Sequence, residues 1–337
     1  MPFEKQNIWI NNKRWDLTFL ILSAALVPIP LILGGYFGFT RTTINILVSL
    51  LVGAPHVYST FTRTLMDKNF TKKHALFLFP MVIILPVGVV YLAMTSLTIL
   101  LTVFFFWASV HVLHQIAYIV DVYDGKRSQR LPFWSKVLDY LVLFSSLYPV
   151  ASWKLISGQF NIGKITLVLP HFLRHEWVAI LANVGFFVLL GLFIIRSIWE
   201  WRNGTLLLPK FLLMSITLLI SYNLPYFKDL DVAFQGFNTW HSFQYLALTW
   251  YINRLRAQRG EIASRLIMAI SRKEKPSAFY AFNLGLAVLS AILILILRKS
   301  GFTAEQSYYS VALSSLLVHY YIDHLLFTDP QAVLKKA

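Results

Sequence analysis

The strongest constraint on this chain is a series of ten apolar runs, each about 20 residues long, joined by short polar connections. An α-helix of that length crosses the roughly 30 Å hydrocarbon core of a bilayer. With 57% hydrophobic and 13% charged residues, the composition is that of an integral membrane protein rather than a soluble domain. We predict an all-α polytopic membrane bundle, one domain over residues 1–337, with spans at about 17–38, 43–66, 75–95, 97–120, 135–152, 177–199, 206–226, 232–255, 278–298 and 305–327.

The net charge of +15 predicts the orientation of the chain in the membrane. If successive connections alternate between the two sides, 23 of the 30 Lys and Arg residues fall on one side. The other seven fall on the opposite side: Arg41, Lys154, Lys164, Arg174, Lys228, Arg298 and Lys299. This positive-inside asymmetry predicts an even number of spans with both termini in the cytoplasm, in a plasma membrane of the bacterial type. The excess charge suits anionic lipid head groups, and its distribution gives no reason to expect a nucleic-acid partner.

Three segments outside the spans have expected roles. The basic and polar lead 1–16 is followed by no small-residue cleavage site, so we expect the first run to remain as a helix. The outer loop 153–176 is expected to fold back as a cap over the bundle. The basic segment 256–276 carries apolar residues at helical spacing, which predicts a short helix in the cytoplasmic interface: Ile262, Leu266, Ile267 and Ile270.

Six of the nine histidines lie inside the apolar runs: His56, His111, His114, His241, His319 and His324. Ionisable residues are costly in hydrocarbon, so six at membrane depth indicate a shared task. All six lie on the second, fourth, eighth and tenth runs, which cross in the same direction and place them at comparable depths. We therefore predict an intramembrane metal site. His171 and His175 form an HxxxH pair on the opposite side and are expected to take no part in it.

Spacing within each helix indicates which side chains share a face. His111 and His114 are three residues apart, and His319 and Asp323 are four apart, so each pair projects from one side of its helix. The candidate ligands are His56, His111, His114, His241 and His319, completed by Asp323 or His324. The candidate hydrogen-bond partners that orient the imidazoles are Gln115, Tyr118, Gln244 and Tyr245. We expect Asp121 at the interface and Asp139 paired locally with Lys136.

The chain has no cysteine, which excludes disulfides, thiolate ligands and iron–sulfur clusters. Nitrogen and oxygen ligands suit iron above all, with zinc or copper as other possibilities, and an iron site with open positions binds O2 beside a substrate. The leading hypothesis is a metal-dependent membrane oxygenase or oxidoreductase, with a lipid-soluble substrate such as a polyene or acyl chain and an electron donor as a possible partner. Two alternatives stay open: a bis-histidine haem b or quinone electron carrier, and a transporter or proton pathway.

The run Gly53-Ala54-Pro55-His56 resembles the Gly-x-Pro-His element of the Brp/Blh-type membrane carotene dioxygenases. The resemblance covers this tetrapeptide, a similar length and a histidine-rich helical bundle. It implies one non-haem iron held by histidines from several helices, with His56 among its ligands. The HxxHH boxes of the membrane desaturases and hydroxylases, which bind two irons, are absent from this chain.

Overall fold

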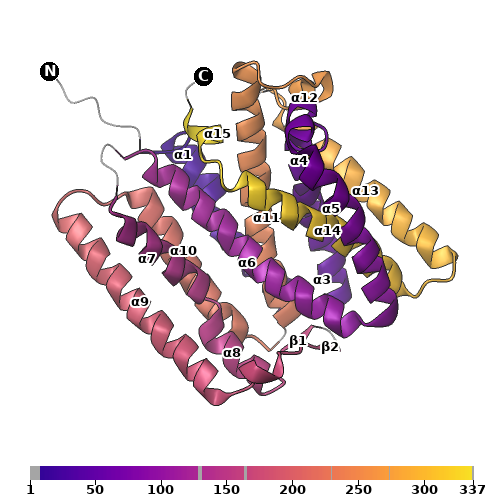
Figure 1. Ribbon diagram of the computed structural model, residues 1–337, viewed down its shortest axis with the longest axis horizontal. Coiled ribbons are helices and arrows are strands. Elements are labelled where there is room, and N and C mark those ends of the chain that lie inside the picture. Colours follow the sequence, from indigo (N-terminus) through magenta and orange to yellow (C-terminus); the bar gives the residue numbers. More distant parts are fainter. Residues whose placement is uncertain (1–7, 128–130, 163–164, 229, 273, 336–337) are drawn as a thin grey trace.

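The computed structural model describes residues 8–127, 131–162, 165–228, 230–272 and 274–335, and helices account for nearly all of its regular structure (Figure 1). The prediction of an all-α fold is therefore confirmed. Within the described residues, seven helical segments are long and apolar enough to cross a membrane, judged by length and composition: Lys13–Gly35, Arg41–Arg63, Lys68–Thr95, Leu97–Asp124, Glu176–Arg202, Leu208–Tyr226 and Pro276–Lys299.

The first two of these segments are assembled from short helical pieces. The first comprises α1 (Lys13–Asp16), a π-helix η1 (Leu17–Ile21), a 3-10 helix η2 (Leu22–Leu26) and α2 (Ile29–Gly35); the second comprises α3 (Arg41–Val48), a π-helix η3 (Ser49–Gly53) and α4 (Ala54–Arg63). The next two are continuous: α5 (Lys68–Thr95) and α6 (Leu97–Asp124). They are separated at the expected polar break, where the Ser96 side chain accepts a hydrogen bond from the backbone N–H of Ile99 and caps α6.

The three remaining predicted spans are also helical but fall outside the seven. Residues 135–152 are divided between α7 (Phe133–Ser145) and α8 (Tyr148–Ile156), with Pro149 in the first turn of α8. Proline cannot continue a helix from the preceding turn, which explains the interruption. The other two, α11 (Leu230–Gln258) and α14 (Ala304–Leu326), have the length of a span but more polar sequences. The count of ten spans therefore stays a prediction.

The other elements complete the bundle: α9 (Glu176–Arg202), α10 (Leu208–Asn223), the 3-10 helix η5 (Leu224–Tyr226), α12 (Arg265–Ile270), α13 (Pro276–Lys299) and α15 (Gln331–Leu334). The short helix α12 lies where the basic segment was expected to be helical, with Ile267 and Ile270 buried and Leu266 exposed. Residue 273 of that segment and residues 1–7 of the lead lie outside the described residues.

The outer loop packs against α6 and α11. It contains a two-stranded antiparallel hairpin, β1 (Asn161–Ile162) and β2 (Ile165–Thr166), and a 3-10 helix η4 (His171–Leu173); residues 163–164 are outside the described part. Phe160 and Leu167 are buried, and the backbone N–H of Val168 donates to Thr102 Oγ1 on α6 at 3.2 Å. These contacts attach the loop to one end of α6.

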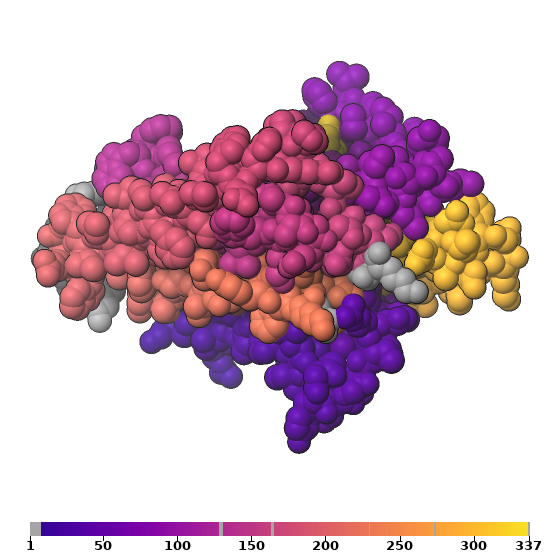
Figure 2. Space-filling view, turned by 90° about the horizontal axis from the view of Figure 1, so that it is seen from below, coloured from indigo at the N-terminus to yellow at the C-terminus, as the bar shows by residue number. Residues whose placement is uncertain are grey.

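Four helices, α4, α11, α6 and α14, form a closed ring of neighbours: each contacts the next, and α14 contacts α4 again. In Figure 1, α6 crosses in front of α11, and α14 lies beside α6. Figure 2 views the end opposite α15. It shows the N-terminal residues (indigo) and the region of α5 and α6 (purple) on opposite sides, with α9 (pink) and α11 (orange) between them. The interior of the molecule is therefore built on α11 and its neighbours.

The outer helices expose apolar side chains along their length. Ile83 on α5, Leu181 on α9 and Leu289 on α13 are each at least 60% exposed, and many neighbours on these helices are similar. A soluble protein rarely presents apolar surface of this extent to water. The surface is typical of helices that face lipid.

A buried network of ion pairs joins α7, α9, α10 and α6. Asp139 accepts from Arg196 at 2.5 Å and from Lys210 at 2.6 Å, and Lys210 also contacts Asp124 at 2.7 Å. The expected pairing of Asp139 with Lys136 is wrong. Lys136 projects from the bundle with a half-exposed side chain and binds Asp121 at 3.0 Å, whereas Asp139 faces inward toward α9 and α10.

Candidate metal centre

The ring of four helices brings four histidines together. His56 on α4, His111 on α6, His241 on α11 and His319 on α14 each place a ring nitrogen within 4.8 Å of the others. All four are buried, with at most 3% of each residue exposed. The ring centroids of neighbouring histidines lie 4.8–5.1 Å apart, in the same order as the helices. The four buried histidines can therefore hold one metal ion.

The local sequence of the second span turns His56 inward. The π-helix η3 ends at Gly53, and α4 begins at Ala54 with Pro55 in its first turn. A π-helix is wider than an α-helix, so its presence changes which residues face the neighbouring helices. A Cβ atom on Gly53 would lie 3.6 Å from Asn238 Nδ2, so α4 begins in close contact with α11.

Two hydroxyl groups orient two of the imidazoles. Ser242 Oγ lies 2.8 Å from His56 Nδ1 and donates to Asn238 Oδ1 at 3.3 Å, so it accepts the Nδ1 proton of His56. Thr60 Oγ1 lies 2.7 Å from His319 Nδ1 and donates to Asp323 Oδ1 at 3.0 Å, so it accepts the Nδ1 proton of His319. In both residues Nε2 is therefore the unprotonated nitrogen, whose lone pair can bind a metal ion.

Each of the four imidazoles has at least one ring nitrogen without a hydrogen-bond partner in the protein. The Nε2 atoms of His56, His111 and His319 and both ring nitrogens of His241 are buried and unpaired. A buried polar atom without a partner costs about 1–3 kcal/mol, so such atoms are normally satisfied. Four imidazoles with unpaired nitrogens, whose candidate ligand atoms lie within 4.8 Å of one another, point to a shared ligand, and imidazole nitrogens suit a transition-metal ion.

Asp323 lies at the edge of the cluster. Its Oδ1 accepts hydrogen bonds from Tyr245 at 2.6 Å and from Thr60 at 3.0 Å. Its Oδ2 has no hydrogen-bond partner and lies 3.5 Å from His319 Nδ1 and 3.9 Å from His111 Nε2. The carboxylate thus anchors the hydroxyl groups behind the imidazoles and brings an acidic group next to the cluster.

The other predicted ligands lie apart from the four. His114 and His324 pair with each other, with ring centroids 5.2 Å apart; His114 is half-buried and His324 is exposed. His171 and His175 are exposed at the other end of the bundle, 6.4 Å apart. A spacing of three residues places His111 and His114 about 60° apart around α6, so they meet different neighbours.

The predicted hydrogen-bond partners are placed differently from one another. Gln115 Nε2 donates to the His241 carbonyl at 3.1 Å and to Gln244 Oε1 at 3.0 Å, and Gln244 Nε2 donates to the Leu20 carbonyl at 2.5 Å. Tyr118 donates to the Asp329 carbonyl at 3.4 Å. These three side chains secure backbone segments around the cluster, while Tyr245 joins the network of Asp323.

Sequence reasoning missed Thr60 and Ser242. A signal existed for Thr60, which follows His56 by four residues and therefore lies on the same face of α4. Ser242 is adjacent to His241 along the chain but binds His56, so helical spacing gives no indication of its partner.

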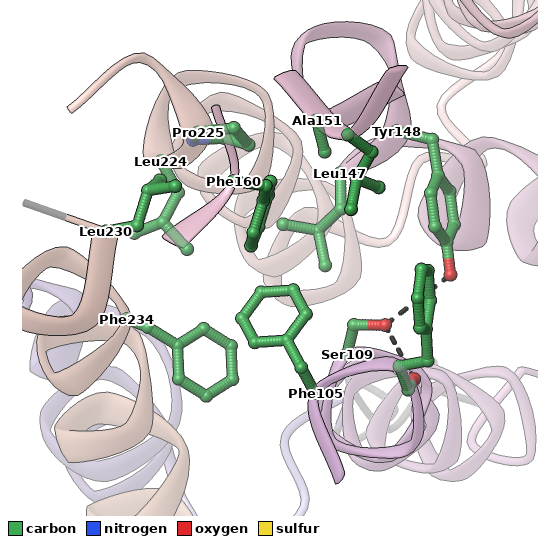
Figure 3. A pocket seen from close by; sticks show the side chains of 12 residues that line it. Phe105, Ser109, Leu147, Tyr148, Ala151, Phe160, Leu224, Pro225, Leu230 and Phe234 are labelled. Carbon is green, nitrogen blue, oxygen red and sulfur yellow. Dashed lines mark hydrogen bonds between the residues drawn. The ribbon is translucent and has the colours of Figure 1, made fainter. Parts of the chain in front are cut away.

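An apolar pocket lies between α6, α8 and α11, beside the loop hairpin (Figure 3). Phe105 and Phe234 line it, and Ser109 contacts Tyr148 at 3.5 Å at its edge. Ser109 lies about 160° around α6 from His111, so the helix separates the pocket from the cluster. Of the aromatic residues at 104–107, Phe105 and Phe106 line the pocket, and Phe104 and Trp107 contact Tyr320.

Comparisons with protein-family models, curated proteins and solved structures find no match for this chain. The chemistry of the site must therefore be inferred from its own residues.

Proposed function

We propose that this protein is a membrane-embedded, metal-dependent oxidoreductase of the oxygenase type, with a non-haem iron held by His56, His111, His241 and His319. The observation that carries the proposal is the convergence of unpaired imidazole nitrogens from four helices. When bound, iron supplies the reactivity toward O2 that amino-acid side chains lack. The side chains of Thr60, Ser242 and Asp323 hold the imidazoles in the orientation for binding.

Iron is favoured by the ligand chemistry. The set contains no sulfur, and imidazole binds iron, zinc and copper. Of these metals, iron is the one that reacts with O2 in non-haem oxygenases. His56 also belongs to the Gly-Ala-Pro-His element that resembles the carotene dioxygenases. The haem alternative is disfavoured by crowding. The candidate ligand nitrogens of all four histidines lie within 4.8 Å of one another, so a porphyrin between two of the imidazoles would overlap the other two.

The proposed topology is ten spans with both termini in the cytoplasm. In support, α1, α12 and α15 lie along one edge of the molecule in Figure 1, and the α8–α9 region and the loop hairpin lie along the opposite edge. Arg265 and Arg272 of the basic segment lie in or directly after α12, at this same edge. Reporter fusions after residue 265 should report the cytoplasm and fusions after residue 165 the outside. The reverse result would reject this orientation.

The proposed substrate is a lipid-soluble molecule such as a polyene or an acyl chain. Its support is the position of the cluster inside a bundle whose outer helices expose apolar side chains, since apolar substrates concentrate in the bilayer. An external electron donor is required if the reaction incorporates only one oxygen atom of O2.

Lipid profiling tests the reaction. Membranes from cells that express the protein, with and without oxygen, would be compared with membranes containing His111→Ala. We expect an oxygenated or cleaved lipid that requires both oxygen and His111. His171→Ala is the matched control: it removes an exposed histidine at the other end of the bundle and should leave the product unchanged. Identical profiles for wild type and His111→Ala, together with a measurable proton or solute flux, would replace the oxygenase by a transporter.

A further inference from the structure

The pair formed by His114 and His324 is open to the surroundings, unlike the four histidines of the centre. Their ring centroids are 5.2 Å apart, His324 is exposed and His114 is half-buried. Phe144 of α7 lies 6.5 Å from His114 and borders the pair. The pair lies between α6 and α14, two of the helices that carry the buried cluster. Two neighbouring imidazoles can bind a divalent transition-metal ion.

One aromatic ring, that of Phe327, neighbours both this pair and the centre. The ring of Phe327 lies 5.2 Å from His114 and 5.9 Å from His111, measured between centroids. It also lies 5.3 Å from Tyr118 and 6.2 Å from Tyr245. Phe327 is 3% exposed and directly follows α14. Along α6, His114 is displaced from His111 by about 4.5 Å. The ring of Phe327 therefore lies next to one histidine of the pair and one histidine of the cluster.

A carboxylate extends the series of donor atoms toward the α15 end. Asp121 follows His114 by two turns on the same side of α6. Its Oδ2 accepts from Lys136 at 3.0 Å and from Tyr140 at 2.7 Å, whereas its Oδ1 is buried and without a partner. Asp121, His114 and His111 follow one another along α6, with His324 of α14 beside His114, and this series of oxygen and nitrogen donors suits a cation.

We propose that His114 and His324 form a transient docking site through which the metal ion reaches the buried centre, with Phe327 as the gate. The inference rests on the metal centre of the proposed function but not on its reaction. The ion binds the exposed pair first and is then transferred to His111 and its three partners. The pair accelerates loading without belonging to the final ligand set.

Cobalt(II) is the probe, because its visible absorption reports ligand binding. Metal-free protein in lipid nanodiscs would be mixed with cobalt(II), and the rate of the absorption change and the final stoichiometry would be measured. We expect the double variant His114→Ala and His324→Ala to load about ten-fold more slowly and to reach the wild-type stoichiometry. His324→Ala alone changes an exposed side chain, so we expect the fold to remain intact, and this variant should also slow loading. Phe327→Leu should speed it.

The double variant His171→Ala and His175→Ala is the matched control, because it removes a second exposed histidine pair, at the other end of the bundle. Its loading rate should equal that of the wild type. Wild-type rates in both His324→Ala and the His114/His324 variant would overturn the docking role while leaving the centre intact. A lower final stoichiometry in these variants would also overturn it, because the pair would then hold the resident ion. Failure of the wild type to bind cobalt(II) would reject the centre itself.

Discussion

Alanine at His56, His111, His241 or His319 is expected to leave a folded protein that purifies with little or no metal. Each substitution removes one of four ligands from a site whose other nitrogens are held in place by different helices. Removing a hydrogen-bond partner of a ligand weakens metal binding by about 10–100-fold. The loss of metal affinity in these alanine variants should be larger. Metal analysis of the purified variants, with helix content from circular dichroism, measures the effect.

Substitution of the hydroxyl groups of Thr60 and Ser242 should give a smaller loss of metal affinity than substitution of the histidines. Thr60→Val and Ser242→Ala should bind metal about 10–100-fold more weakly, because His319 and His56 lose the acceptor of their Nδ1 protons. Thr62→Val is the control: this buried threonine on α4 bonds with Asn253 and the Ser59 carbonyl, away from the cluster. Full metal occupancy in His111→Ala and His319→Ala would reject the site.

The second large effect is on stability. Asp139→Ala leaves Arg196 and Lys210 buried without their shared carboxylate, and the free energy of unfolding should fall by about 3–5 kcal/mol. Lys136→Ala breaks the partly exposed pair with Asp121 and should cost about 0–1 kcal/mol. Unfolding of the purified protein in mixed micelles, followed by circular dichroism, gives both values.

Metal binding provides a check on this stability prediction. The network of Asp139 joins α6, α7, α9 and α10 and includes none of the four histidines. Asp139→Ala protein that remains folded should therefore keep its metal. Equal losses of stability in Asp139→Ala and Lys136→Ala would show that the buried network contributes no more than a surface ion pair.

The two networks of polar side chains have different functions in the bundle. The ion pairs around Asp139 satisfy every member with an opposite charge and so hold four helices together. The histidine cluster instead leaves at least one nitrogen of each imidazole unpaired, and hydroxyl groups orient two of the rings. Buried charges that are paired with opposite charges serve the fold, whereas converging groups without partners point to a ligand.

The length and composition of the apolar runs predict most of the helices, but not the break between α7 and α8 or the π-helices of the first two segments. Apolar runs of about 20 residues are typical of membrane-spanning helices. Polar residues such as Ser96 mark the ends of helices, because their side chains form hydrogen bonds with the first backbone N–H groups. The relative heights of histidines on one helix also follow from the sequence, because an α-helix rises by a constant length per residue. These properties depend on neighbours along the chain.

The selection of four histidines from six was decided by tertiary structure. His111 and His114 share a helix, but only His111 faces α11 and α4, because the crossing of α6 with its neighbours sets which side is interior. The partners that orient the imidazoles are also distant in sequence: Thr60 and His319 are 259 residues apart, and Ser242 and His56 are 186 apart. Helical spacing determines which residues share a face, and only the packing of the helices determines what that face meets.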